Sequence, residues 1–217
     1  WFIRSPSTTR AEFCAKVGLP ADRPFVLYLC SSAFIAPNES DFVTKWIRAV
    51  RTAPDRRVRE ASVLVRPHPE NLQPWQRSDF AAVDNVVLWP RGGANPIDAT
   101  SKNDYFDSIY HSAAAVGVNT SAQIEAGIAG RSVYTISSAE HAGTQEGTLH
   151  FHYLLHAGGG LVVHAEDFDE HVGQLGRAFD RRPEDATKLE GFVRAFVRPH
   201  GLDTPATPLL VQAVERL

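Results

Sequence analysis

The sequence predicts an α/β protein with a Rossmann-like, doubly wound parallel sheet. Continuous apolar runs, such as 25–30 and 62–65, are typical of strands buried on both faces of a parallel sheet. Segments with helical apolar spacing, such as 39–53, alternate with these runs. The chain has 217 residues, 43% of them hydrophobic, which is enough for one sizeable core, so a single main domain is expected.

Turn and cap residues divide the chain into elements. Gly18-Leu19-Pro20 ends a first helix, Asn103-Asp104 is expected to cap another, and Gly158–Gly160 separates a helix from a strand. Residues 1–24 are expected to be a connector, 25–197 the Rossmann-like domain and 198–217 a C-terminal tail helix. The expected strands are 25–30, 62–65, 85–89, 113–118, 132–136 and 161–164, and the expected helices are 10–17, 39–53, 103–111, 120–129, 151–156, 166–179, 183–197 and 206–217.

Composition and missing motifs exclude several classes of function. The formal net charge of −3 gives no basic footprint, so no nucleic-acid partner is expected. No apolar run approaches the roughly 20 residues that a transmembrane helix needs. The two cysteines provide no disulfide framework. The chain contains no GxGxxG, GxxxxGK[ST] or GxSxG motif, which argues against a dinucleotide oxidoreductase, a P-loop enzyme and a nucleophile-elbow hydrolase.

A polar corner joins the strand at 113–118 to the next helix. Asn119, Thr120 and Ser121 stand where a helix N-terminus would face a ligand, and backbone N–H groups with the helix dipole suit phosphate there. Ser and Thr are also ordinary N-caps, so the corner alone does not decide between a cap and a phosphate site.

Further polar residues follow the other predicted strands. Ser31 and Ser32 come after the first strand, Arg66 and His68 after the second, and the run 91–95 after the third. Ligands of an open parallel sheet collect at the carboxyl ends of its strands, so these residues are expected to converge with the 119–121 corner. His68 lies between two prolines that fix its direction, and it could bind phosphate, act as an acid or base, or only satisfy a strand-end carbonyl.

Two more groups carry candidate chemistry. Glu125 lies one helical turn after Ser121 and could accept hydrogen bonds from ribose hydroxyls or be a solvated helix glutamate. The segment with Gln145, Thr148 and His150 is interpreted as a loop that faces the acceptor or the donor, or as a helix cap. Histidines cluster between 141 and 164, but no HExxH motif is present, so neither a metal nor another cofactor is expected.

The order of these motifs resembles one family. The run Arg66-Pro67-His68-Pro69, the segment 104–112 and the run 118–126 with Gly130 are similar to the C-terminal half of GT-B-type glycosyltransferases. The likeness covers roughly 25–180 and is greatest to bacterial capsule polymerases, polysialyltransferases and CDP-glycerol glycerophosphotransferases, which share an HP motif and a Ser/Thr motif.

The resemblance implies a function and its residues. His68 would contact the donor phosphates, Thr120 and Ser121 would bind phosphate, and Glu125 would take the ribose. The donor would be a sugar or polyol phosphate activated by CMP, CDP or UDP, and the acceptor a glycan. A GT-B enzyme has a second, N-terminal domain that usually supplies the acceptor site. The resemblance implies such a missing N-terminal domain as a partner of this sequence, which starts at Trp1 and has no Met.

Two other functions stay open on the sequence. A non-hydrolysing UDP-sugar epimerase has the same double-domain architecture and related strand-end motifs, and a non-catalytic nucleotide-binding or scaffold domain would need the same fold. The expected location is the cytoplasm, free or peripheral at the inner membrane.

Overall fold

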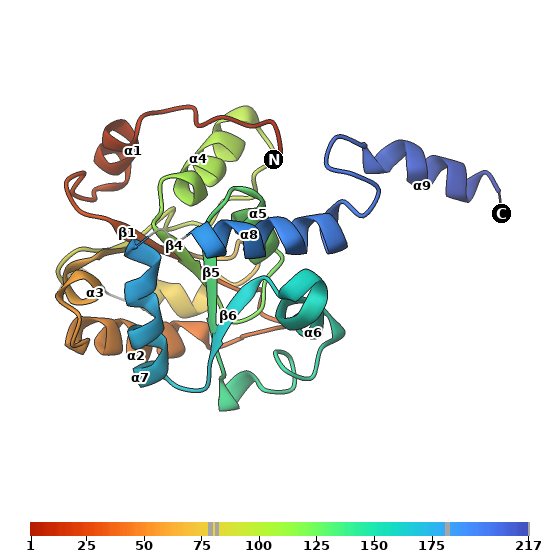
Figure 1. Cartoon of the computed structure of the whole chain (residues 1–217). Coiled ribbons are helices and arrows are strands. Elements are labelled where there is room, and N and C mark those ends of the chain that lie inside the picture. The colour runs from red at the N-terminus through yellow and green to blue at the C-terminus, as the bar shows by residue number, and fades with distance from the viewer. Residues whose placement is uncertain (78–79, 81–82, 181–182, 217) are drawn as a thin grey trace.

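A parallel sheet lies at the centre of the computed structural model, which describes residues 1–77, 80, 83–180 and 183–216 (Figure 1). Within these residues the sheet has six strands in the order β3-β2-β1-β4-β5-β6, and every neighbouring pair is parallel. The order reverses between β1 and β4, so the predicted Rossmann-like doubly wound sheet is confirmed. The strands are β1 (Phe25–Leu29), β2 (Ser62–Arg66), β3 (Val86–Leu88), β4 (Ala114–Val116), β5 (Ser132–Ile136) and β6 (Val162–Ala165).

Helices connect the strands and cover both faces of the sheet (Figure 1). The α-helices of the described residues are α1 (Arg10–Val17), α2 (Glu39–Thr52), α3 (Arg56–Glu60), α4 (Ala99–Tyr110), α5 (Ala122–Ile128), α6 (Leu149–His156), α7 (Phe168–Leu175), α8 (Pro183–Phe192) and α9 (Ala206–Val214). Short 3₁₀ turns occupy Gln73–Arg77, Ala139–His141, Ala157–Gly159 and Gly176–Phe179, and a π-helical turn, Val193–Val197, continues α8.

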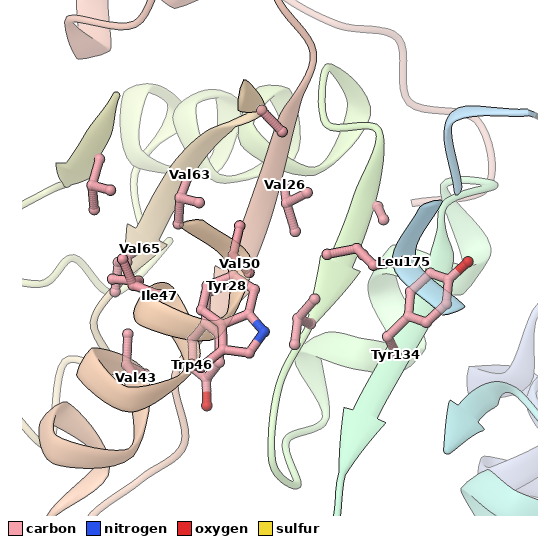
Figure 2. Packing of buried hydrophobic residues seen from close by; sticks show 14 of the residues in the cluster. Val26, Tyr28, Val43, Trp46, Ile47, Val50, Val63, Val65, Tyr134 and Leu175 are labelled. Carbon is pink, nitrogen blue, oxygen red and sulfur yellow. The ribbon is translucent and has the colours of Figure 1, made fainter. Parts of the chain in front are cut away.

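Each face of the sheet buries its own hydrophobic cluster, because side chains alternate along a strand. On β1, Tyr28 belongs to one cluster and Leu27 to the other. The first cluster packs under α2 and α7, and Figure 2 shows Trp46 of α2 and Leu175 of α7 among its strand residues. The second cluster takes side chains from α1, α4, α5 and α8. Both faces are therefore covered, and the ligand-accessible part of the sheet is its edge.

Two helices start earlier than their sequence pattern predicts. Asp98, and not Asn103-Asp104, caps α4: its carboxylate accepts a hydrogen bond from the Ser101 N–H at 2.9 Å. Thr148 caps α6 in the same way, with the Phe151 N–H as donor at 3.3 Å. In both cases a polar side chain satisfies a first-turn donor before the apolar periodicity becomes visible.

The segments expected as connector and tail differ in how they pack. Residues 1–24 lie against the body: Ser7 and Thr8 donate hydrogen bonds to the buried carboxylate of Asp107 on α4. Helix α9 lies apart from the sheet and its covering helices in Figure 1, and Leu217, the last residue of the predicted tail, is outside the described residues. No helix in the described part of the chain combines the length and the hydropathy needed to cross a membrane.

Candidate functional site

A cavity of about 150 Å³ opens at the carboxyl ends of β1, β2 and β4. Its wall contains residues from five segments of the chain, because neighbouring parallel strands end at the same edge of the sheet. Among the residues predicted for the site, the cavity is lined by Arg66, His68, Thr120, Ser121 and Glu125. The loop after β3 adds Ala94–Pro96, and α4 adds Tyr105.

A larger hollow of about 1190 Å³ lies beside α2 and the segment 70–83. None of the predicted site residues lines it, and part of the chain beside it lies outside the described residues. The smaller cavity is therefore the candidate site.

Arg66 is a buried cation whose terminal nitrogens lack partners. It is the last residue of β2 and is only 5% exposed. Its guanidinium lies between two aromatic rings, 5.4 Å from the ring centre of Trp89 and 5.0 Å from that of Tyr105. Neither Nη1 nor Nη2 has a hydrogen-bond partner among the described residues, and burial lowers the pKa of Arg66 to about 10. A desolvated guanidinium of this kind has a strong preference for an anion.

His68 lies at the mouth of the cavity as a neutral side chain. It is half-buried, and the Glu70 N–H donates a hydrogen bond to its Nδ1 at 3.2 Å. Because Nδ1 accepts, the neutral ring carries its proton on Nε2. Burial lowers the pKa of His68, and the nearby Glu70 opposes this shift only in part. The ring is thus set to donate one hydrogen bond from Nε2 without a charge.

Glu125 and Tyr105 form a hydrogen-bonded pair across two helices. The Tyr105 hydroxyl of α4 donates to Oε2 of Glu125 on α5. Burial raises the pKa of Glu125, while the hydrogen bonds from Tyr105 and Trp1 act in the opposite direction. Since the same tyrosine ring lies against Arg66, the three side chains form a continuous row from β2 through α4 to α5.

The start of α5 uses part of its own hydrogen-bonding capacity. The Thr120 N–H donates to Oε1 of Gln123 at 3.1 Å, and the Gln123 amide donates to the Gly117 carbonyl at 3.1 Å. Ser121 occupies the N-cap position, is exposed, and makes no side-chain capping hydrogen bond. The Ser121 hydroxyl is therefore one group of the predicted corner that the helix itself does not use.

Ser31 and Ser32 lie outside the cavity lining. The Ser31 N–H and hydroxyl donate to the carboxylate of Glu39, at 2.6 and 3.3 Å. Tyr28 donates to the same carboxylate at 3.2 Å, and the Asn71 amide donates to the Ala36 carbonyl at 2.9 Å and to the Ser31 carbonyl at 3.3 Å. We call these residues, Tyr28, Ser31, Glu39 and Asn71, the Glu39 network. It ties the loop after β1 to the loop that carries His68.

The segment after β5 is held by a second internal network, formed by Asn119, Thr144, Gln145 and Thr148 and called the Gln145 network below. The fully buried Gln145 donates to the carbonyls of Val118 and Ile136, at 3.0 and 2.9 Å, and accepts from the Ser138 N–H at 3.0 Å. The Asn119 amide donates to the Thr144 carbonyl and to the Thr148 hydroxyl, at 2.9 and 3.0 Å.

None of Asn119, Gln145, Thr148 and His150 lines the cavity. The Oδ1 of Asn119 and the Nε2 of His150 have no partner within the described part of the chain, and burial lowers the pKa of His150. Among the described residues, no group of three or more His, Cys, Asp and Glu is placed to hold a metal ion.

Sequence reasoning missed Trp89, Tyr105, Glu39 and Asn71. One signal for Glu39 was available: it lies three, four and seven residues before Phe42, Val43 and Trp46, on the apolar stripe of α2. A glutamate on such a stripe must find donors in the core. Trp89 and Tyr105 gave no comparable signal, because an aromatic residue at the end of a strand or on a helix normally packs in a core.

A comparison with solved structures finds proteins with the same fold, among them TagF and WaaG. The wall teichoic acid polymerase TagF matches with a TM-score of 0.57 and 13% sequence identity, over 87% of this chain and 42% of TagF. WaaG, a glycosyltransferase involved in lipopolysaccharide biosynthesis, matches with a TM-score of 0.51 and 18% identity, over 96% of this chain and 50% of WaaG. The chain has the Rossmann-like fold of these glycosyltransferases. It spans half or less of their length, and no family model and no curated protein sequence matches it.

Proposed function

We propose that this chain is the nucleotide-donor-binding half of a GT-B-type glycosyltransferase, or of a polyol-phosphate transferase, in bacterial surface-polysaccharide biosynthesis. The observation that supports it best is the common cavity of Arg66, His68, Thr120, Ser121 and Glu125, residues that come from two separate stretches of sequence. The solved structures with this fold include a wall teichoic acid polymerase and a lipopolysaccharide glycosyltransferase, which suits the same class of reaction.

In the proposed site the donor phosphate faces Arg66, the Nε2–H of His68 and the Ser121 hydroxyl. The acceptor oxygen forms a bond to the transferred group, and the bond from that group to the donor phosphate oxygen breaks. The electron pair leaves with the phosphate, so negative charge builds up on it. The fixed charge of Arg66 and the hydrogen bond from His68 stabilise this charge. The acceptor proton goes to a base outside the residues assigned here.

Glu125 recognises the other end of the nucleotide in this proposal. Its carboxylate lies in the same cavity and is buried enough to favour ligand hydroxyls as hydrogen-bond donors. The ribose of a CMP-, CDP- or UDP-activated donor provides two such hydroxyls.

A calorimetric titration with CMP, CDP, UDP and GDP tests the proposal. At least one of them should bind the 217-residue chain, and His68→Ala should weaken that binding about tenfold, the loss expected for one hydrogen bond to a charged group. His200→Ala, at an exposed histidine far from the cavity, is the matched control. Absence of binding by all four nucleotides would contradict the proposal and favour a scaffold domain.

A transfer assay with the whole protein that contains this chain separates transfer from epimerisation. A transferase releases nucleotide only when an acceptor is present and extends that acceptor. A product formed from the nucleotide sugar alone, with no acceptor, would contradict transfer and identify an epimerase.

A further inference from the structure

Tyr105 contacts two residues of the candidate site with two different parts of its side chain. Its ring lies 5.0 Å from the Arg66 guanidinium, and its hydroxyl donates to Oε2 of Glu125. It comes from α4, whereas Arg66 ends β2 and Glu125 lies on α5, so no other described residue joins these two by direct contacts of this kind. We propose that Tyr105 is a positioning residue that aligns Arg66 for the donor phosphate and Glu125 for the donor ribose, an inference that rests on the proposed function.

The contact with Arg66 needs only the aromatic ring. A guanidinium stacks on aromatic faces and then presents its N–H groups within its own plane. Trp89 and Tyr105 each lie against the Arg66 guanidinium, and its terminal nitrogens have no other partner within the described residues. The rings therefore restrict the rotation of a long side chain that no salt bridge holds. A phenylalanine at position 105 would retain this contact.

The contact with Glu125 needs only the hydroxyl. A buried carboxylate without a fixed donor can rotate about its terminal torsion, which is broad and roughly two-fold. Tyr105 donates to Oε2 of this half-buried carboxylate, Trp1 is a second donor to it, and the acceptor positions that these two leave open are available to a ligand. The ribose of a nucleotide provides vicinal hydroxyls of the kind that such a fixed carboxylate accepts.

These two roles predict that a mutation can abolish the preference for a ribose nucleotide over its dideoxy analogue and leave the affinity for the phosphate unchanged. The variant Tyr105→Phe keeps the ring and loses the donor, and Tyr105→Leu loses both. Tyr110→Phe is the matched control, because it removes an exposed tyrosine hydroxyl from the same helix. Thermal unfolding of each variant reports whether the domain still folds.

The experiment measures dissociation constants for the tightest binder among CDP, UDP and GDP and for its 2′,3′-dideoxy analogue. The wild-type chain should prefer the ribose form about tenfold, the value of one or two hydrogen bonds. In Tyr105→Phe this preference should fall to about twofold or less, while affinity for the dideoxy form stays within about twofold of wild type. Tyr105→Leu should also weaken the dideoxy form, and Tyr110→Phe should change neither.

A double-mutant cycle tests whether Tyr105 affects ribose binding through Glu125 or directly. If Tyr105 acts on ribose through Glu125, adding Tyr105→Phe to Glu125→Gln should change the ribose preference by less than about twofold. The inference is wrong if Tyr105→Phe lowers the affinity for the ribose nucleotide and for the dideoxy analogue equally, or if it leaves the wild-type preference for ribose unchanged. Either result leaves the proposed function intact. A wild-type chain that binds no nucleotide overturns both.

Discussion

The cavity and the two networks beside it contain the same kinds of residues, but they differ in whether the polar groups have hydrogen-bond partners within the described chain. In the Gln145 network, both the amide nitrogen and the oxygen of Gln145 bond to the chain, and the Glu39 network surrounds its carboxylate with three donors. In the cavity, both terminal nitrogens of Arg66 lack partners within the described chain, and Ser121 makes no capping bond. All three lie along the carboxyl edge of one sheet, so position alone does not distinguish a ligand site from a support.

Because of this difference, mutations in the networks and mutations in the cavity should have different effects on stability. A residue whose hydrogen bonds are all internal stabilises the fold, and its loss leaves buried partners unsatisfied. A buried charge without a partner destabilises the fold and is retained only if something else needs it. Mutations in the networks should therefore change stability, and mutations in the cavity should change ligand binding.

The largest effect is expected from pH at Glu39. Burial raises the pKa of Glu39 to about 8, against the lowering effect of the bonds from Ser31 and Tyr28. The native state therefore holds a proton that the unfolded state releases above about pH 4.5, and this group's contribution to stability falls as pH rises toward 8. The free energy of unfolding should lose up to about 4 kcal/mol across this range from Glu39 alone.

Glu39→Gln should remove this pH dependence, because an amide can occupy the same position without ionising. Urea denaturation between pH 5 and 9 measures it, with the exposed Glu215→Gln as the control. A wild-type stability that does not fall relative to Glu39→Gln as pH rises would show that Glu39 is already ionised in the fold.

Gln145→Ala is expected to have the next largest effect. It removes the Gln145 donor to the Ile136 carbonyl, one of two donors to the Val118 carbonyl, and the acceptor of the Ser138 N–H, which should cost about 2–3 kcal/mol of unfolding free energy. Gln212→Ala, at an exposed glutamine on α9, should be near neutral in the same urea titration. A variant that keeps wild-type stability but loses nucleotide affinity would show that Gln145 binds the ligand and does not stabilise the fold.

The sequence could predict the strands and part of the candidate site, because these features follow from the type and spacing of residues along the chain. Apolar runs identified the strands, because a strand covered on both faces has few polar positions. Strand-end placement selected His68, because parallel strands end at one edge, and helical spacing from Ser121 selected Glu125. The separation of Ser31 and Gln145 from the cavity could not be read in this way. It depends on the donors and acceptors that other elements bring to each side chain, and Glu39 and Tyr105 lie 8 and 20 residues from the groups they bond.

A smaller effect is expected for His68, and it distinguishes a neutral ring from a charged one. The lowered pKa of His68 favours the neutral ring at neutral pH, so nucleotide affinity relative to His68→Gln should change little from about pH 7 to 8. The glutamine Nε2 can replace the histidine Nε2–H, so His68→Gln should bind within about threefold of wild type at pH 7.5. A wild-type affinity that falls steeply relative to His68→Gln over this range would mean that the charged ring binds the phosphate.

The measurement that tests the central claim most directly is the paired stability and nucleotide affinity of Arg66→Met. Methionine can fill the space between Trp89 and Tyr105 without an unpaired charge. The variant should match or exceed wild-type stability, by about 1–3 kcal/mol, and lose at least about tenfold in affinity for the nucleotide that binds best. A variant that is less stable than wild type and binds that nucleotide as well as before would contradict the account, because Arg66 would then support the fold and not the ligand.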